Sequence, residues 1–237
     1  QLLGLFRHGK MDNFGYAVRV FKQHIERGYS IDSLKGKVVL EIGPGDSVAT
    51  AIIASAYGAR AVLIDVAPFA SKDLSFYYGL SDFLKGIGGS PPDINSCSSV
   101  DEILKVCSAE YLTNGLKSIS SLNEDSIDFI FSQAVLEHIR KQEFLEFMSQ
   151  CRRVLKPSGI SSHTVDLKDH LGGSLNNLHF SEKLWESELF KLAGFNIDVI
   201  SVSRWKSLPT AKSKLSWPFR ELTDEQLCIS GFNVVCK

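Results

Sequence analysis

Two acidic residues, Glu41 and Asp65, stand near the ends of short apolar segments. Glu41 precedes the turn Gly43-Pro44-Gly45, and Asp65 follows that turn by about twenty residues. Glycine in such a turn lets backbone N–H groups approach a ligand without an intervening Cβ. A carboxylate at Asp65 can accept hydrogen bonds from both hydroxyls of a ribose, and the Glu41 carboxylate favours an ammonium over a pyrophosphate. The pattern predicts a site for a nucleotide-type cofactor.

The dinucleotide-binding pattern G-x-G-x-x-G is incomplete, because Val48 stands where its third glycine would be. The carboxylate of Glu41 beside the turn also disfavours the pyrophosphate of a dinucleotide. Both features argue against a nicotinamide-dependent oxidoreductase and favour a smaller cofactor.

Ionisable residues that could accept a proton gather in two places. Glu137 and His138 follow the apolar segment 127–132, and the segment 163–170 holds His163, Asp166 and His170. Histidine and carboxylate groups are the usual general bases near neutral pH. We expect Asp166, Asp169 and His170 at the mouth of a site. The Glu137-His138 pair could instead cap the following helix, as such pairs often do. The other histidines are expected to be lid or surface residues (His8, His24) or to line an acceptor pocket (His179).

Alternating apolar segments and helical periodicities must position these residues. The alternation predicts an α/β domain with a mostly parallel sheet and helices on both faces. The last two strands could pair as an antiparallel hairpin at the sheet edge. We predict strands at 38–42, 61–65, 111–113, 127–132, 160–167, 195–205 and 230–237, and helices at 15–27, 47–57, 69–85, 100–110, 142–155 and 181–193, with a short helix and turn at 218–227.

The composition limits the possible partners and compartment. The chain has 237 residues, a net charge of -1 and 44% hydrophobic residues, which suits one α/β domain with an appended element. The near-neutral charge argues against nucleic acid and anionic membranes as partners. Five widely spaced cysteines without a C-x-x-C pattern favour a reducing, cytoplasmic location.

Four blocks together resemble the class I S-adenosylmethionine-dependent methyltransferases. They are EIGPGDS, LID, SIDFIFSQAVLEHI and RVLKPSGI, in this order and spacing. The resemblance implies a Rossmann-like, seven-stranded, mostly parallel sheet whose last strand is antiparallel. It places the methyltransferase domain at 36–237, after an N-terminal helical extension at 1–35 that could form a lid or simply pack on the sheet.

The resemblance also implies roles for individual residues. Glu41, Gly43 and Gly45 would cradle the methionyl part of S-adenosylmethionine, while Asp65 would bind its ribose. Ser47 stands where the family has a further glycine. The remaining cofactor contacts would be Val66 and Leu116 beside the adenine, and Ser132 and Gln133 facing cofactor and substrate.

The function expected from these features is methyl transfer to a small-molecule acceptor, with oxygen preferred because His and Asp cluster at the site. The base would come from His138, His163, Asp166 or His170. Carbon or nitrogen acceptors, a non-catalytic cofactor-binding scaffold and a homodimer remain alternatives. Some relatives bind a divalent metal through E-x-x-E-H, but the block from Gln133 to His138 lacks the first Glu. We therefore expect no metal, and a metal held by Glu137, His138 and either His163 or His170 stays a lesser alternative.

Overall fold

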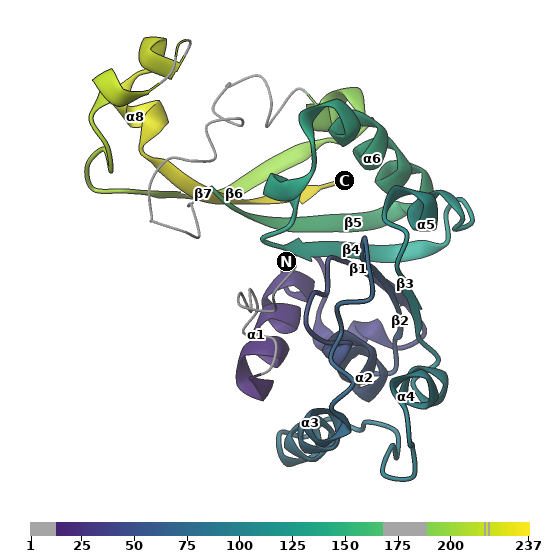
Figure 1. The fold of residues 1–237 in the computed structure, drawn as a ribbon. Helices are drawn as coiled ribbons and strands as arrows, with labels where there is room; N and C mark the ends of the chain where they lie inside the picture. Colours follow the sequence, from purple (N-terminus) through teal and green to yellow (C-terminus); the bar gives the residue numbers. More distant parts are fainter. Residues whose placement is uncertain (1–12, 168–188, 216, 218) are drawn as a thin grey trace.

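The computed structural model describes residues 13–167 and 189–237, apart from 216 and 218. Its sheet has seven strands in the order β3-β2-β1-β4-β5-β7-β6 (Figure 1). Every pairing is parallel except those of β7, which runs antiparallel to both β5 and β6. The predicted sheet and its edge hairpin are therefore confirmed. The strands are β1 (Val38–Ile42), β2 (Arg60–Ile64), β3 (Glu110–Leu112), β4 (Ile127–Gln133), β5 (Leu155–Asp166), β6 (Ile197–Arg204) and β7 (Ile229–Cys236).

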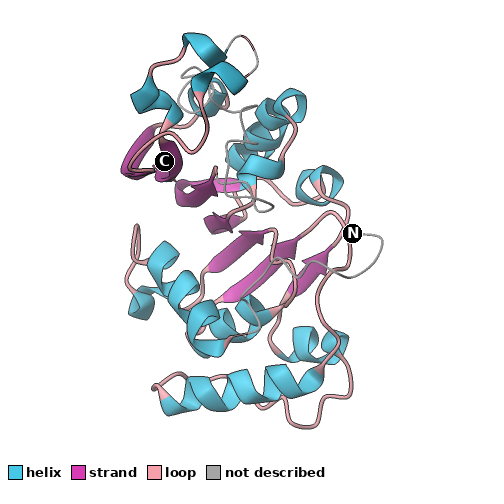
Figure 2. Ribbon diagram, turned by 60° about the vertical axis from the view of Figure 1, so that its left-hand side comes forward, coloured by secondary structure: helices cyan, strands magenta, loops and turns pink. Residues whose placement is uncertain are grey.

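Helices cover both faces of this sheet (Figure 2). The side chains of two residues set clear helix starts: Asn13 accepts the Tyr16 N–H at 2.9 Å, and Asp73 accepts the Ser75 N–H at 3.0 Å. The Asp73 cap starts α3 later than the predicted residue 69, because an N-cap residue takes a non-helical conformation. The α-helices are α1 (Phe14–Ile25), α2 (Ala49–Ala56), α3 (Leu74–Gly86), α4 (Val100–Val106), α5 (Leu116–Ser120), α6 (Lys141–Val154) and α8 (Asp224–Leu227). Short 3-10 turns lie at Ile31–Leu34, Leu136–His138, Lys212–Lys214 and Phe219–Glu221.

Two other boundaries differ from the prediction. Helix α4 ends at Val106 instead of residue 110, and Ser108 has a φ of 51°, which a helix cannot continue through. Strand β5 begins at Leu155, which was predicted as the last residue of the helix 142–155, and not at the predicted residue 160. Its pairing shifts between Ile127–Leu155 and Phe129–Ile160, so the extra residues form an irregularity inside the strand. Of the predicted helix 181–193, only residues from 189 onward are described.

Alternate residues of each central strand enter two separate cores. Val39 and Phe129 pack in the core under α1 to α4, while Leu40 and Ile130 pack in the core under α5 and α6. This follows from the two-residue period of a strand that is buried on both faces. Buried residues of α1 (Ala17, Val18, Phe21, Ile25) belong to the first core, so this helix packs on the sheet. A lid formed by residues 1–35 stays a prediction, and residues 1–12 lie outside the described ranges.

The segment between β6 and β7 forms an appendage at one end of the sheet. Leu215 and Leu227 are buried together there, with Trp205, Leu208 and Leu222 packed around them. Figure 1 shows this segment beyond the ends of β6 and β7, away from α1 to α4. The helices of the described ranges include none that is long and apolar enough to cross a membrane.

Candidate active site

The turn after β1 is held in a left-handed conformation. Gly43 has a φ of +70° and Gly45 a φ of +63°, a region that side chains rarely adopt. A Cβ on Gly43 would lie 2.5 Å from Cγ2 of Val135, whereas a Cβ on Gly45 would meet nothing within 4 Å. Gly43 is therefore needed for close packing against the segment after β4, and Gly45 leaves an open space beside the turn.

Glu41 is buried at the end of β1, with only 2% of its surface exposed. Burial raises the pKa of its carboxyl to about 7, and the Asp65 carboxylate adds to this rise, while the Thr50 hydroxyl opposes it. Its Oε2 atom has no hydrogen-bond partner among the described residues. A buried carboxyl oxygen without a donor is costly, so this position is suited to a cationic ligand group.

Asp65 follows β2 and faces the same turn. Its Oδ2 atom accepts the Gly45 N–H at 3.1 Å and its Oδ1 atom accepts the Val66 N–H at 2.7 Å. Burial raises the pKa of this carboxyl, and the two N–H donors counteract the rise. The carboxylate therefore joins the end of β2 to the glycine turn and lies where its remaining lone pairs can meet ribose hydroxyls.

Val66 and the start of α5 form a neighbouring apolar surface. The Val66 side chain is 73% exposed, and a Cβ on Gly115 would lie 3.2 Å from its Cγ1 atom. The Gly115 N–H donates to the Asp65 carbonyl at 2.9 Å. Leu116 follows Gly115 but packs, partly buried, against the core under α5 and α6. Val66 and the start of α5, both predicted to lie beside the adenine, are thus neighbours of each other and of Asp65.

Ser132 and His163 face the interior. Ser132 is fully buried, and its hydroxyl is 2.8 Å from Nδ1 of His163. The other ring nitrogen, Nε2, contacts the Ser161 hydroxyl. Burial, with the cationic Arg27 and nearby His24, lowers the pKa of His163 to about 3. Both ring nitrogens thus contact buried serine hydroxyls. His163 and the Ser132 hydroxyl therefore face the protein interior and not the mouth of the site.

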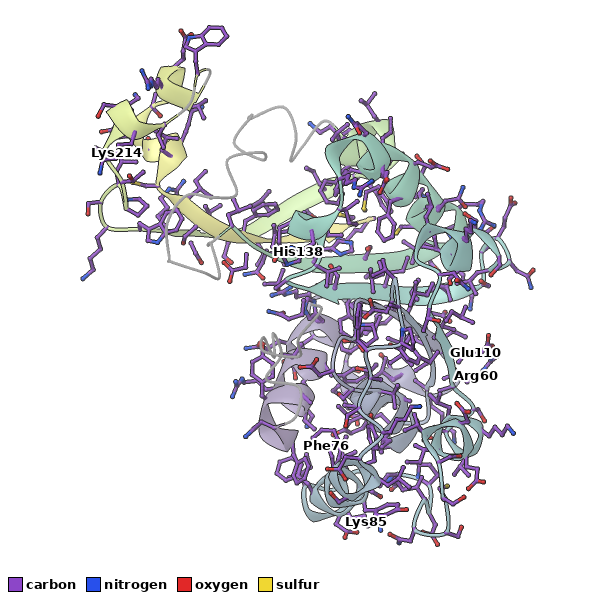
Figure 3. All side chains as sticks on the ribbon, viewed as in Figure 1. Arg60, Phe76, Lys85, Glu110, His138 and Lys214 are labelled. Atoms are coloured by element: carbon purple, nitrogen blue, oxygen red, sulfur yellow. The ribbon has the colours of Figure 1, made fainter. Side chains whose placement is uncertain are left out.

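Glu137, His138 and Asp166 lie together at the carboxyl ends of β4 and β5. Glu137 is buried, and its Oε1 atom accepts the Asp166 N–H at 3.3 Å. Burial raises the pKa of Glu137 to about 8, and the Asp166 carboxylate adds to the rise, while the backbone N–H groups of Glu137 and Asp166 oppose it. His138 is exposed on the short turn after β4 (Figure 3). His170 lies outside the described residues.

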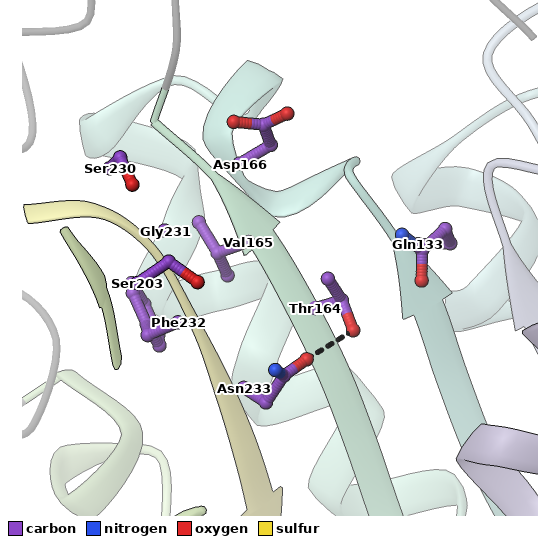
Figure 4. Close-up of a pocket in the computed structure, with 9 residues that line it drawn as sticks. All are labelled: Gln133, Thr164, Val165, Asp166, Ser203, Ser230, Gly231, Phe232 and Asn233. Atoms are coloured by element: carbon purple, nitrogen blue, oxygen red, sulfur yellow. Dashed lines mark hydrogen bonds between the residues drawn. The ribbon is translucent and has the colours of Figure 1, made fainter. Parts of the chain in front are cut away.

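A shallow depression of about 150 Å³ opens at the same edge of the sheet. Figure 4 shows Gln133 from β4 and Thr164 and Asp166 from β5 around it, with a hydrogen bond of 2.6 Å from Thr164 to Oδ1 of Asn233. Its walls are polar and come from β4, β5, β6 and β7. The lining residues are Gln133, Thr164, Val165, Asp166, Ser203, Ser230, Gly231, Phe232 and Asn233.

Comparison with known proteins identifies the family. Residues 40–162, more than half of the chain, match the profile of a family described as a methyltransferase domain. The chain belongs to this methyltransferase family. The predicted class, a class I enzyme that uses S-adenosylmethionine, is confirmed. A search of curated protein sequences found no significant match.

Solved structures agree with the fold of this methyltransferase. The YcgJ protein from Bacillus subtilis has a TM-score of 0.50 at 14% identity, covering 94% of this chain and 96% of that one. Phosphoethanolamine N-methyltransferase 2 from Haemonchus contortus, solved with phosphomonomethylethanolamine and S-adenosylhomocysteine, has a TM-score of 0.51 at 16% identity, covering 94% of this chain but 52% of that one. A methyltransferase from Archaeoglobus fulgidus has a TM-score of 0.48 at 13% identity, covering 96% and 97% of the two chains. At these identities the likeness concerns the fold alone.

The residues of the methyltransferase fit the cofactor. The open space beside Gly45, the unpartnered Oε2 atom of Glu41 and the carboxylate of Asp65 lie around one turn. Glu41 would meet the cationic amino group, Asp65 the ribose hydroxyls and Val66 the adenine face. When bound, S-adenosylmethionine supplies a methyl group made electrophilic by the sulfonium.

A metal site is not assembled by the described side chains of the methyltransferase. None of their His, Cys, Asp and Glu residues form a group of three that could hold an ion. The alternative ligand His163 is turned into the interior by two serine hydroxyls, and the other alternative, His170, lies outside the described ranges.

Sequence reasoning missed part of this site. His24 was expected to be a surface or lid residue, but it is 1% exposed and contacts Gln133 and Ser162. That expectation was wrong because α1 packs His24 against β4 and β5. Arg27 was also missed, because nothing in the sequence around it indicated that its side chain would reach β5 and β7. Only the helical spacing of His24 with Phe21 and Val20 could have indicated that His24 faces the core.

Proposed function

We propose that this methyltransferase transfers the methyl group to an oxygen atom of a small molecule bound in the depression at the ends of β4 and β5. The observation that carries the proposal is the position of Asp166, which both lines the depression and adjoins the buried carboxyl of Glu137. The depression lies at the carboxyl ends of β4 and β5, the edge at which such sheets bind ligands.

The residues of this chain would have two tasks during transfer. They would hold the acceptor oxygen in line with the methyl carbon, since alignment supplies much of the rate of a displacement. They would also take the hydroxyl proton as the oxygen–carbon bond forms and the carbon–sulfur bond breaks, the electron pair of the broken bond remaining on sulfur. Asp166 is our candidate for this base, and the exposed His138 on the turn after β4 is the second candidate.

Glu137 supports this assignment through electrostatics. A carboxyl whose pKa is raised to about 8 is mostly protonated at neutral pH, so it does not compete with Asp166 as an anion. His170 stays a prediction, and the buried position of His163 gives no support for a direct role.

The first experiment separates cofactor binding from transfer. Calorimetry with S-adenosylhomocysteine should give binding to the wild type and weaker binding to Asp65→Ala. Methyl transfer from labelled S-adenosylmethionine is then screened against small hydroxylated, amine and thiol acceptors. We expect hydroxylated acceptors to be methylated, and Asp166→Asn to reduce transfer by a factor of about 10²–10⁴ without changing S-adenosylhomocysteine affinity.

The matched control is Asp198→Asn, which makes the same change on exposed β6, where Asp198 pairs with Lys237 at 3.7 Å. It should leave transfer unchanged. Methylation of amines or thiols alone would contradict the oxygen proposal. Cofactor binding with no transfer to any acceptor would instead support the non-catalytic alternative.

A further inference from the structure

The end of α1 and the turn that follows it place two polar side chains, His24 and Arg27, against strands β4, β5 and β7. His24 Nδ1 is 2.9 Å from the Ser162 hydroxyl, and His24 Nε2 is 3.1 Å from Oε1 of Gln133. Arg27 follows one turn later. Its Nη1 atom contacts the hydroxyls of Ser162 at 3.1 Å and Thr164 at 3.3 Å, and its Nη2 atom donates to Asn233 Oδ1 at 2.8 Å.

Arg27 imposes one direction on these hydrogen bonds because a guanidinium can only donate. The Ser162 oxygen accepts from Arg27, so its own proton is available for His24 Nδ1. Arg27 Nη1 is also 3.3 Å from His24 Nδ1, a contact that a lone pair on that nitrogen suits better than a proton. Burial and the Arg27 cation lower the pKa of His24 to about 3, and hydrogen bonds to Gln133 and to the Ser162 backbone oppose this fall. His24 is therefore neutral, and a proton on Nε2 is the tautomer that suits the contacts of both ring nitrogens.

The proton on Nε2 in turn orients the side chain of Gln133. An Nε2–H donor must face the amide oxygen of Gln133, so the amide NH₂ group points elsewhere. Figure 4 shows the nitrogen of Gln133 on the side of β5, where Thr164 and Asp166 line the depression. We propose that His24 and Arg27 are positioning residues that turn the Gln133 NH₂ group into the acceptor pocket, making Gln133 a specificity-determining donor.

This inference rests on the proposed function and narrows its substrate class. The Thr164 proton is used by Asn233 Oδ1 at 2.6 Å, and the Asn233 amide donates to the Ser201 hydroxyl at 2.8 Å. Gln133 therefore supplies donors at one side of the depression, and the Asp166 carboxylate supplies an acceptor at the other. The matching ligand is a hydroxyl compound that also carries an oxygen lone pair, such as a carbonyl or carboxylate oxygen, for Gln133.

The orientation is tested by NMR on the full chain saturated with S-adenosylhomocysteine. Long-range ¹H–¹⁵N spectra at pH 7 should show His24 neutral with its proton on Nε2. The Gln133 NH₂ resonances, assigned by their loss in Gln133→Glu, should broaden strongly with a soluble neutral paramagnetic agent. In Arg27→Met, where the donor-only cation is gone, a population of the Nδ1–H form should appear.

Two results would overturn the proposal. One is a wild-type His24 protonated on Nδ1 or on both nitrogens. The other is a Gln133 NH₂ group that is shielded from the paramagnetic agent, as it would be if it donated to His24. Because neither result depends on methyl transfer, failure of the orientation is distinguishable from failure of the proposed function.

Kinetics then test the role in specificity. With a hydroxylated acceptor from the screen, Gln133→Glu should raise KM by about tenfold or more, the effect of losing one hydrogen bond and gaining a repulsive oxygen. Gln150→Glu on α6, where Gln150 accepts from Arg153 at 2.7 Å, is the matched control and should leave KM unchanged. An unchanged KM in Gln133→Glu would contradict the donor role.

Discussion

The turn after β1 allows stability and cofactor binding to be separated by three alanine substitutions. Gly45 and Gly36 both have positive φ values, +63° and +78°, and an added Cβ meets nothing within 4 Å at either position. Gly45 lies in the predicted cofactor cradle, whereas Gly36 precedes β1 at the opposite end of that strand. Gly43 differs from both, because its Cβ would lie 2.5 Å from a Val135 methyl group.

The expected losses of unfolding free energy follow from this geometry. A left-handed alanine costs about 1–2 kcal/mol, so Gly36→Ala and Gly45→Ala should be destabilised to a similar extent. For a chain of this size each 1 kcal/mol lowers Tm by roughly 2–4 °C. Gly43→Ala adds the displacement of Val135, and its total cost should be about 2–5 kcal/mol.

The affinity for S-adenosylhomocysteine should distinguish Gly45→Ala from Gly36→Ala, although their stabilities should be similar. The methyl group of Gly45→Ala occupies the open space beside the turn, so we expect S-adenosylhomocysteine affinity to fall at least ~10-fold, or about 1.4 kcal/mol. Gly36→Ala should bind like the wild type. Thermal melts give the stability order and calorimetry gives the affinities. If Gly45→Ala binds S-adenosylhomocysteine as tightly as Gly36→Ala, the assignment of this turn as the cofactor cradle is refuted.

Three further predictions concern buried charge. The folded pKa of Glu137, about 8, lies above its ordinary value of 4.5. The contribution of this carboxyl to the free energy of unfolding is therefore complete below about pH 4.5 and is lost as pH rises through 8, at about 1.4 kcal/mol per pKa unit. Urea titrations of Glu137→Gln should lack this decline. The folded pKa of His163, about 3, lies below 6.5, so wild-type stability should fall as pH drops from 6.5 to 3, and His163→Gln should fall less steeply in the same titration. Asp128 accepts from Lys156 at 2.7 Å and from the Val38 N–H at 2.9 Å, so Asp128→Asn should lose about 1 kcal/mol by chemical denaturation. A loss no larger than that of the exposed Asp198→Asn would contradict this last prediction.

Local patterns in the sequence were sufficient for the sheet and the cofactor turn. Strands β1, β2 and β4 are short apolar runs, and a strand buried on both faces needs little beyond such a run. Gly43 and Gly45 were identified because glycine tolerates positive φ and close contact, and Asp65 because it follows the turn at a ribose-binding distance. These signals are local in the chain, so they can be recognised without knowledge of the tertiary structure. The boundaries of α3, α4 and β5 were less accurate, because side-chain caps, a positive φ at Ser108 and a strand irregularity set them.

The acceptor side of the site depends on contacts between distant segments. His163 and His170 were both candidate bases, but the side-chain direction of β5 and the hydroxyls of Ser132 and Ser161 bury His163. His24 lies more than one hundred residues before Gln133 in the chain, and only the packing of α1 on β4 and β5 brings their side chains within 3.1 Å. The sequence by itself determined the methyltransferase class and the position of the glycine turn, since both depend on residues close in the chain. The tertiary structure alone decided which polar side chains are buried and which line the depression, because burial and hydrogen-bond partners are set by neighbours that the sequence does not place together.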